Sequence, residues 1–282
     1  MAVKAMKFRA ACVQMRSGLS RAANTDAALA LIREAAEGAA AFVATPEVTN
    51  VADLDPDRLF ADLPEEAGLD EIGRFADAAR AHGLWLLIGS LVVRVGPRKA
   101  ANRSYLFAPD GRLAATYDKL HMFDVSLPKG ETWKESNVFE AGDRAVCVET
   151  PLAKLGLTIC YDVRFPHLYR ALSQAGAEVL CVPAAFTRQT GEAHWETLLR
   201  ARAIECGAFI IAPAQGGKHE DGRETYGHSL IIGPWGDILA EADNDAPGVI
   251  FADLEPDKAA EARRRIPNLA LERNPEVLIV KP

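Results

Sequence analysis

What the sequence lacks excludes several classes of protein. No apolar run is long enough to span a bilayer, and residues 1–11 carry scattered charges in place of an apolar signal core. No basic cluster or nucleic-acid-binding motif is present, and the net charge is -7 with a pI near 5.5. We therefore expect no membrane segment, no secretion and no nucleic acid partner.

The cysteines offer no paired pattern. They are 5 in number and widely spread, at positions 12, 147, 160, 181 and 206. No two of them form a C-x-x-C pair, so neither a zinc site nor a dithiol redox site is predicted. We expect reduced thiols and a cytoplasmic location.

The sequence also lacks an internal repeat and any linker rich in Gly, Ser or Pro, so residues 1–282 are predicted to form a single domain. Short apolar runs alternate with amphipathic segments, which indicates an α/β fold with buried sheets. The strands are too many for one open sheet, so we expect two stacked sheets flanked by helices. Strands are expected over 6–15, 40–44, 84–95, 102–108, 113–117, 145–148, 155–159, 178–182, 208–213, 228–232, 238–242 and 249–253, and helices over 20–37, 65–81, 166–175, 194–206 and 255–265.

Two further segments are expected to be irregular. Residues 53–63 have the composition of a loop, and residues 118–140 are polar, with Pro128, Gly130 and isolated aromatic residues. A loop as long as the second one is usually functional in a compact domain.

A cysteine directly follows one of the apolar strands. Cys160 comes after the run 155–159, and Phe165-Pro166 then opens a helical pattern. Backbone N–H groups and the helix dipole favour negative charge before a helix, so we expect a position that suits a thiolate. The alternative is that Cys160 is a small buried apolar residue, which is a common role for cysteine.

Two other reactive or charged residues also follow apolar strands. Glu47 ends Ala44-Thr45-Pro46-Glu47, and Lys119 follows Tyr117-Asp118. Each alone is consistent with a solvated charge at a strand end or on the surface. Because ligands bind at the carboxyl ends of strands in α/β folds, we expect Glu47, Lys119 and Cys160 to converge as base, cation and nucleophile.

These residues carry a resemblance over almost the whole chain to the nitrilase superfamily of carbon–nitrogen hydrolases. The matching motifs are Thr45-Pro46-Glu47, Tyr117-Asp118-Lys119-Leu120-His121 and Cys160-Tyr161-Asp162-Val163-Arg164-Phe165-Pro166, and Glu135 matches a second acidic position. The resemblance implies a four-layer αββα sandwich and a Glu47-Lys119-Cys160 triad. It further implies that no metal or organic cofactor takes part.

The resemblance implies a role for each residue of the triad. Cys160 would attack an amide carbon and form a thioester, and Glu47 would act as its general base. Lys119 and the backbone N–H of Tyr161 would hold the oxyanion, with Glu135 in a supporting role.

The motif regions also supply the expected substrate contacts, which are Phe123, Arg164, Phe186 and Thr187. A structural role at the cysteine turn is the alternative for Arg164. His121 and His194 lack metal-ligand spacing and are expected to form structural hydrogen bonds.

Within the superfamily, residues 186–196, 199–205, 214–219 and 226–229 resemble the branch of deaminated glutathione amidases and omega-amidases. The implied substrate is a 2-oxo acid with a terminal amide, and the deaminated glutathione type is favoured. The alternatives are an omega-amidase for 2-oxoglutaramate or 2-oxosuccinamate, or another small-amide or nitrile hydrolase. A non-catalytic scaffold is disfavoured because the whole triad is present. His167 departs from the Glu that often follows Phe-Pro in this pattern.

The expected partners are a small-molecule amide, water and further copies of the chain. The resemblance implies a homodimer or a larger homo-oligomer. The tail 268–282 contains the apolar run Val277–Val280, which would suit a partner surface.

Overall fold

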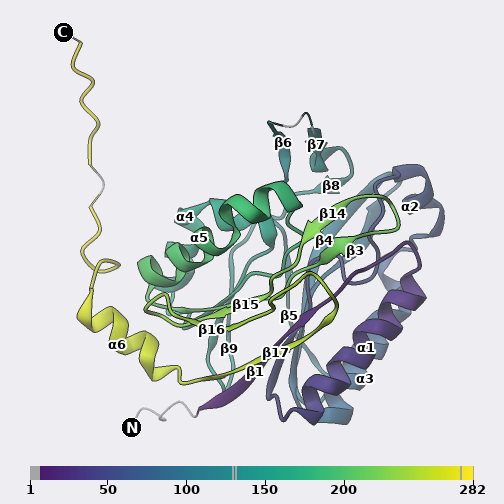
Figure 1. Cartoon of the computed structure of the whole chain (residues 1–282), viewed down its shortest axis with the longest axis horizontal. Coiled ribbons are helices and arrows are strands. Elements are labelled where there is room, and N and C mark those ends of the chain that lie inside the picture. Colours follow the sequence, from purple (N-terminus) through teal and green to yellow (C-terminus); the bar gives the residue numbers. More distant parts are fainter. Residues whose placement is uncertain (1–6, 129, 131, 274, 282) are drawn as a thin grey trace.

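Two stacked β-sheets form the centre of the protein, and helices cover the outer face of each (Figure 1). The structure is a computed structural model that describes residues 7–128, 130, 132–273 and 275–281. The first sheet has the strand order β17 (Gly248–Leu254), β1 (Phe8–Gln14), β2 (Phe42–Ala44), β3 (Trp85–Gly96), β4 (Lys99–Phe107) and β5 (Leu113–Asp118), with β8 (Phe139–Glu140) also beside β4. The second has the order β16 (Ile238–Glu241), β15 (Leu230–Ile232), β12 (Phe209–Ala212), β11 (Val179–Cys181), β10 (Lys154–Leu157) and β9 (Val146–Glu149).

The helices complete four layers. α1 (Arg21–Glu37) and α3 (Asp70–His82) pack on the first sheet, and α4 (Pro166–Gln174) and α5 (Arg188–Cys206) pack on the second (Figure 1). α6 (Asp257–Arg265) follows the last strand. This arrangement confirms the predicted αββα class. Within the described part of the chain, no helix is both long and apolar enough to cross a membrane.

Buried apolar side chains fill the space between the layers. Phe42 and Leu106 of the first sheet and Leu180 and Ile211 of the second belong to one cluster, so the two sheets share a core. A second cluster joins the first sheet to α1 and α3 and includes Phe75 of α3. Burial of this apolar surface stabilises the packing of the two sheets against each other. The site depends on this packing because its residues come from both sheets.

The predicted boundaries were wrong at three places. Residues 53–63, expected as a loop, contain α2 (Pro56–Asp62), because the Asp55 side chain accepts from the first N–H groups of the helix. The expected helix 65–81 is split into η1 (Glu66–Gly68) and α3. α5 begins at Arg188 rather than His194, with Thr187 as its N-cap.

The expected irregular segments hold short elements. Residues 118–140 contain β6 (Asp124–Ser126), β7 (Thr132–Lys134) and η2 (Glu135–Asn137). Residues 215–226, for which no strand was predicted, contain the hairpin of β13 (Gly216–Lys218) and β14 (Glu224–Tyr226). Strands this short have little periodicity to reveal them. Met6, where the first strand was expected to begin, lies outside the described residues.

Candidate active site

Three strands from two sheets end at one place and carry Glu47, Lys119 and Cys160. β2 is parallel to β3, and β3 and β5 are each antiparallel to β4. β2 and β5 therefore run in the same direction, so Glu47 and Lys119 leave the first sheet at the same edge. Cys160 arrives from β10 of the second sheet.

Glu47 lies on a tight turn directly after β2. Val48 has φ 50°, a left-handed conformation that is rare for a β-branched residue, and its N–H donates to Ser90 Oγ at 2.8 Å. The turn also lies against Gly89, where a Cβ would come within 2.1 Å of the Thr45 carbonyl oxygen. This close approach of β3 fixes the direction in which Glu47 leaves the sheet.

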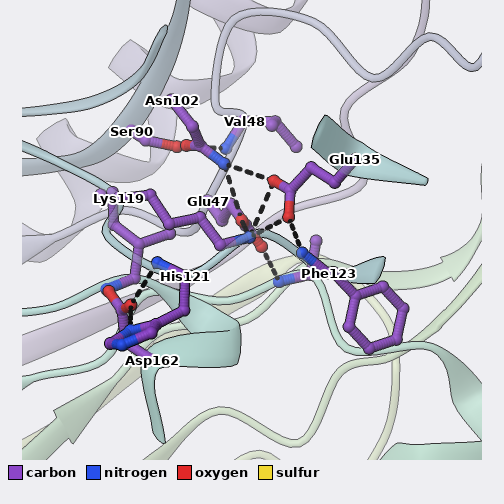
Figure 2. Close-up of polar contacts among 12 residues, drawn as sticks. Glu47, Val48, Ser90, Asn102, Lys119, His121, Phe123, Glu135 and Asp162 are labelled. Carbon is purple, nitrogen blue, oxygen red and sulfur yellow. Dashed lines mark hydrogen bonds and ion pairs between the residues drawn. The ribbon is translucent and has the colours of Figure 1, made fainter. Parts of the chain in front are cut away.

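Glu47 and Glu135 share one ammonium group (Figure 2). Lys119 Nζ lies 2.8 Å from Glu47 Oε1, and 2.8 and 2.9 Å from the two carboxylate oxygens of Glu135. Lys119 is 2% exposed and Glu47 4% exposed. Burial alone would lower the pKa of Lys119, but the charges of Glu135 and Glu47 outweigh burial and raise it well above 10.5. Lys119 is therefore a permanent cation.

Asn102 joins the two carboxylates and was not predicted from the sequence. This residue is on β4, and its Nδ2 donates to Glu47 Oε1 at 2.9 Å and to Glu135 Oε1 at 3.4 Å (Figure 2). Its Oδ1 is buried without a hydrogen-bond partner. A buried acceptor without a partner lowers the stability of the fold. The Asn102 side chain therefore holds the two carboxylates in position at a cost in stability. A lone Asn within a strand gives no sequence signal for such a role.

Cys160 occupies a strained position at the start of η3 (Cys160–Arg164). Its φ is 48°, and its N–H donates to the Pro183 carbonyl oxygen at 2.8 Å. The buried Asp162 holds this turn by accepting from the Ile159 N–H and the Tyr117 hydroxyl. His121 also bonds to Asp162, through Nδ1 at 2.7 Å (Figure 2). Asp162 was likewise missed as a site residue.

The expectation that this position favours a thiolate was wrong for the free enzyme. Burial raises the pKa of the Cys160 thiol well above its ordinary value of 9.0, and the nearby charge of Glu47 raises it further. Lys119 lowers it, but only in part. Cys160 therefore rests as a thiol, and a base would have to remove its proton before it could act as a nucleophile.

A cavity of about 520 Å³ opens over these groups. Glu47, Asn102, Lys119, Glu135 and Cys160 all line it, so the structure brings the predicted triad and Glu135 together. Its volume is typical of pockets for small molecules. No group of three or more His, Cys, Asp or Glu side chains that could hold a metal ion occurs among the described residues.

The predicted substrate contacts divide into two groups. Phe123, Phe186 and Thr187 line the cavity, as does Tyr161, which was predicted as an oxyanion donor. Arg164 is not among the lining residues: its guanidinium lies over the rings of Tyr161 and Phe186, at 5.9 and 5.4 Å from their centroids. It also lies 3.3 Å from His194 Nδ1. These contacts favour the structural alternative for Arg164.

Comparison with known proteins agrees with this geometry. The family model for carbon–nitrogen hydrolases matches residues 9–264. The chain is 50% identical over 173 residues to the deaminated glutathione amidase of Synechocystis sp., which covers 61% of this chain and 63% of that protein. It is 38% identical over 262 residues to the deaminated glutathione amidase of Homo sapiens, covering 91% of this chain and 80% of that protein.

A solved structure is also similar. The C. elegans NitFhit protein superimposes with a TM-score of 0.88 at 33% identity, covering 96% of this chain and 66% of that one. The matches to the Synechocystis and C. elegans proteins thus span slightly less than two thirds of the length of each. The chain belongs to the carbon–nitrogen hydrolase family, within the nitrilase superfamily.

Proposed function

We propose that the protein is an amidase that cleaves the C–N bond of a small 2-oxo-acid amide through a thioester on Cys160. The observation that carries the proposal is the placement of Glu47 against both the thiol and the Lys119 ammonium, at the floor of one cavity. Similarity to proteins named deaminated glutathione amidase supports the substrate class.

The first half-reaction makes the thioester. Glu47 takes the proton of the Cys160 thiol as the sulfur forms a bond to the amide carbon. The tetrahedral intermediate then collapses, the C–N bond breaks, and Glu47 gives that proton to the leaving nitrogen. The acyl group remains on Cys160.

The second half-reaction releases the acid. Glu47 takes a proton from water as its oxygen bonds to the thioester carbon. The C–S bond then breaks, and Glu47 returns the proton to the sulfur. One water molecule is consumed, and the thiol and the carboxylate are as they began.

Lys119 and the Tyr161 N–H are assigned to the oxyanion. Tyr161 is in the first turn of η3, where N–H groups lack partners within the helix. An ammonium has three donors, and those of Lys119 face three carboxylate oxygens in the free enzyme. Lys119 therefore contributes its charge to the oxyanion, and must release a carboxylate oxygen to bond to it directly.

The substrate assigned here is deaminated glutathione, in which the scissile amide joins a 2-oxo acid to a dipeptide. An omega-amidase acting on 2-oxoglutaramate or 2-oxosuccinamate is the second candidate, because the same triad serves an ammonia leaving group. A cavity of about 520 Å³ favours the larger substrate.

A three-substrate assay tests the proposal. Release of 2-oxoglutarate is measured from deaminated glutathione and from 2-oxoglutaramate, and carboxylate formation is measured from a simple aliphatic nitrile. The proposal requires the highest kcat/KM with deaminated glutathione. Preference for 2-oxoglutaramate identifies an omega-amidase, and preference for the nitrile contradicts the proposed activity.

We also propose that residues 1–282 are one domain that acts in the cytoplasm as a homodimer or larger homo-oligomer. The exposed apolar tail residues support the assembly. The proposed chemistry needs no cofactor or metal, since Glu47, Lys119 and Cys160 supply base, cation and nucleophile.

A further inference from the structure

An arginine that the proposed reaction does not use lines the same cavity. Arg223 lies beside β14 on the β13–β14 hairpin, with its side chain 15% exposed. Its Nε donates to Asp221 Oδ2 at 2.7 Å, and its backbone N–H donates to Asp221 Oδ1. The Asp221 side chain is 1% exposed, so Arg223 is held by a buried acid.

This pairing leaves the end of the guanidinium available. The hydrogen bonds of the Arg223 side chain to the described residues involve Nε alone, and its two terminal nitrogens are not among the buried unpaired atoms. Two adjacent N–H groups on a rigid plane match the two oxygens of a carboxylate. The acids that line this part of the cavity do not compete, because Asp53 is paired with Arg58 and Glu224 with Arg188.

The hairpin register places Arg223 on the leaving-group side. The Ala185 N–H donates to Glu47 Oε2, and Glu47 must face the leaving nitrogen to protonate it. Thr187, two residues after Ala185, forms an antiparallel bridge with Thr225. Because the two segments are antiparallel, Arg223 lies two residues beyond this bridge, on the side away from Ala185. Four residues of extended chain span roughly 13 Å.

A leaving group of two residues covers about half of that distance, at roughly 7 Å. Arg223 lines the cavity, and an extended arginine side chain is long enough to span the rest. Building on the proposed function, we propose that Arg223 binds the carboxylate of a peptide leaving group, and so selects an amide whose leaving group ends in a carboxylate. Asp221 is a positioning residue that holds the guanidinium in place.

The test compares two enzymes on three substrates. These are deaminated glutathione, its analogue with the terminal carboxylate replaced by a carboxamide, and 2-oxoglutaramate, which has no peptide leaving group. For Arg223→Gln we expect kcat/KM to fall about 10- to 100-fold with deaminated glutathione, mainly through KM. With the other two substrates we expect less than about a twofold change, since they lack the carboxylate that Arg223 binds.

Unchanged turnover of 2-oxoglutaramate also shows that the variant is folded with an intact triad. Arg98→Gln is the matched control, because it removes one positive charge from a site outside the cavity lining, and its activity should equal that of the wild type. Arg223→Lys should recover part of the loss. An equal loss on all three substrates, or no loss on deaminated glutathione, overturns the assignment of Arg223. If the wild-type enzyme turns over neither deaminated glutathione nor its analogue, the proposed function itself fails, and the assignment fails with it.

Discussion

The Lys119 side chain balances two carboxylates beside the buried thiol of Cys160. Glu47 and Glu135 together carry more negative charge than one ammonium neutralises. Burial raises the pKa of the Cys160 thiol, and the negative charge of the neighbouring Glu47 raises it further. In the proposed mechanism, the free enzyme therefore holds Cys160 protonated until substrate arrives and Glu47 removes the proton.

The ionisation of Cys160 should respond to the charge of Glu47. Glu47 raises the pKa of the thiol, so Glu47→Gln removes a negative charge and should move the pKa to a lower value. An NMR titration of the enzyme labelled at cysteine Cβ measures this directly, with Cys160→Ser identifying the resonance. A midpoint that stays in place or moves upward in Glu47→Gln would contradict this electrostatic account.

Asn102 should matter more for activity than for stability. Asn102→Leu removes the donor shared by the two carboxylates, and we expect kcat/KM to fall about 10- to 100-fold. It also removes the unpaired Oδ1, so the midpoint of thermal unfolding should change little. Asn102→Asp keeps the shape but adds a third carboxylate, and should lose more activity than Asn102→Leu. Equal activity of all three enzymes would exclude a role for Asn102.

The site residues that could be predicted from the sequence are those that belong to motifs directly after strands. Glu47, Lys119 and Cys160 each follow an apolar run, and the structure brings them together as expected. Asn102, Asp162 and Arg223 were not predicted as site residues, because their roles depend on contacts between segments distant in sequence. The protonation of Cys160 was also mispredicted, since local position suggested a helix dipole and only the fold shows burial beside Glu47.

The turn that follows β2 and carries Glu47 packs closely against Gly89 of β3, and the site depends on this contact. At Gly89 an added Cβ would lie 2.1 Å from the Thr45 oxygen, 2.4 Å from Pro183 Cβ and 2.5 Å from the Pro46 oxygen. Pro183 also accepts from the Cys160 N–H. Gly89 therefore lies against the segments that position both Glu47 and Cys160.

Gly89→Ala should damage both fold and function. Because the nearest atoms are mostly backbone, relief requires movement of the turn, and we expect a loss of about 1–3 kcal/mol in the free energy of unfolding with a large loss of kcat. Gly73→Ala is the control: it lies in α3 with no atom within 4 Å of the new Cβ, and should stabilise by about 0.5–1 kcal/mol. Denaturant unfolding and kcat measure both. A Gly89→Ala enzyme with wild-type stability would contradict the account of this contact.

The spacing of apolar residues predicted the long helices and strands. The helix starts that it missed depend on capping side chains. α3 ends at His82, one residue from the predicted end of the helix, and Gly83 caps it in a left-handed conformation with φ 64°. α2 was missed because one Asp side chain nucleates a helix too short to show a period. The early start of α5 depends on the Thr187 cap, which a sequence pattern built on apolar spacing does not weigh.

In the described part of the chain, residues 277–280 form a run of exposed large apolar side chains. Val277, Leu278, Ile279 and Val280 are 75–84% exposed, and Figure 1 shows the tail extending away from the sandwich after α6. Exposed apolar residues in a row are unfavourable in water, so a second copy is the proposed cover.

Replacing all four of these residues with Ser should therefore reduce assembly. We expect the wild-type protein to sediment as a dimer or larger oligomer, and the variant to shift toward the monomer in analytical ultracentrifugation. Leu113→Ser, which alters an isolated exposed apolar residue of β5, should leave the assembly unchanged. A variant with the wild-type sedimentation coefficient would show that the tail does not make the interface.

The central claim is that Cys160 forms a thioester that Glu47 helps to hydrolyse. Intact-protein mass spectrometry of Glu47→Gln mixed with deaminated glutathione tests it most directly, with Cys160→Ala as the companion variant. Glu47→Gln lacks the base of both half-reactions, but its lowered thiol pKa leaves a thiolate at high pH that can still attack the amide, whereas no side chain remains to activate water. At high pH we therefore expect Glu47→Gln to accumulate an adduct with the mass of the acyl group, located on Cys160 by peptide mapping, and Cys160→Ala to be inactive and unmodified. Absence of any adduct in Glu47→Gln, together with full activity of Cys160→Ala, would contradict it.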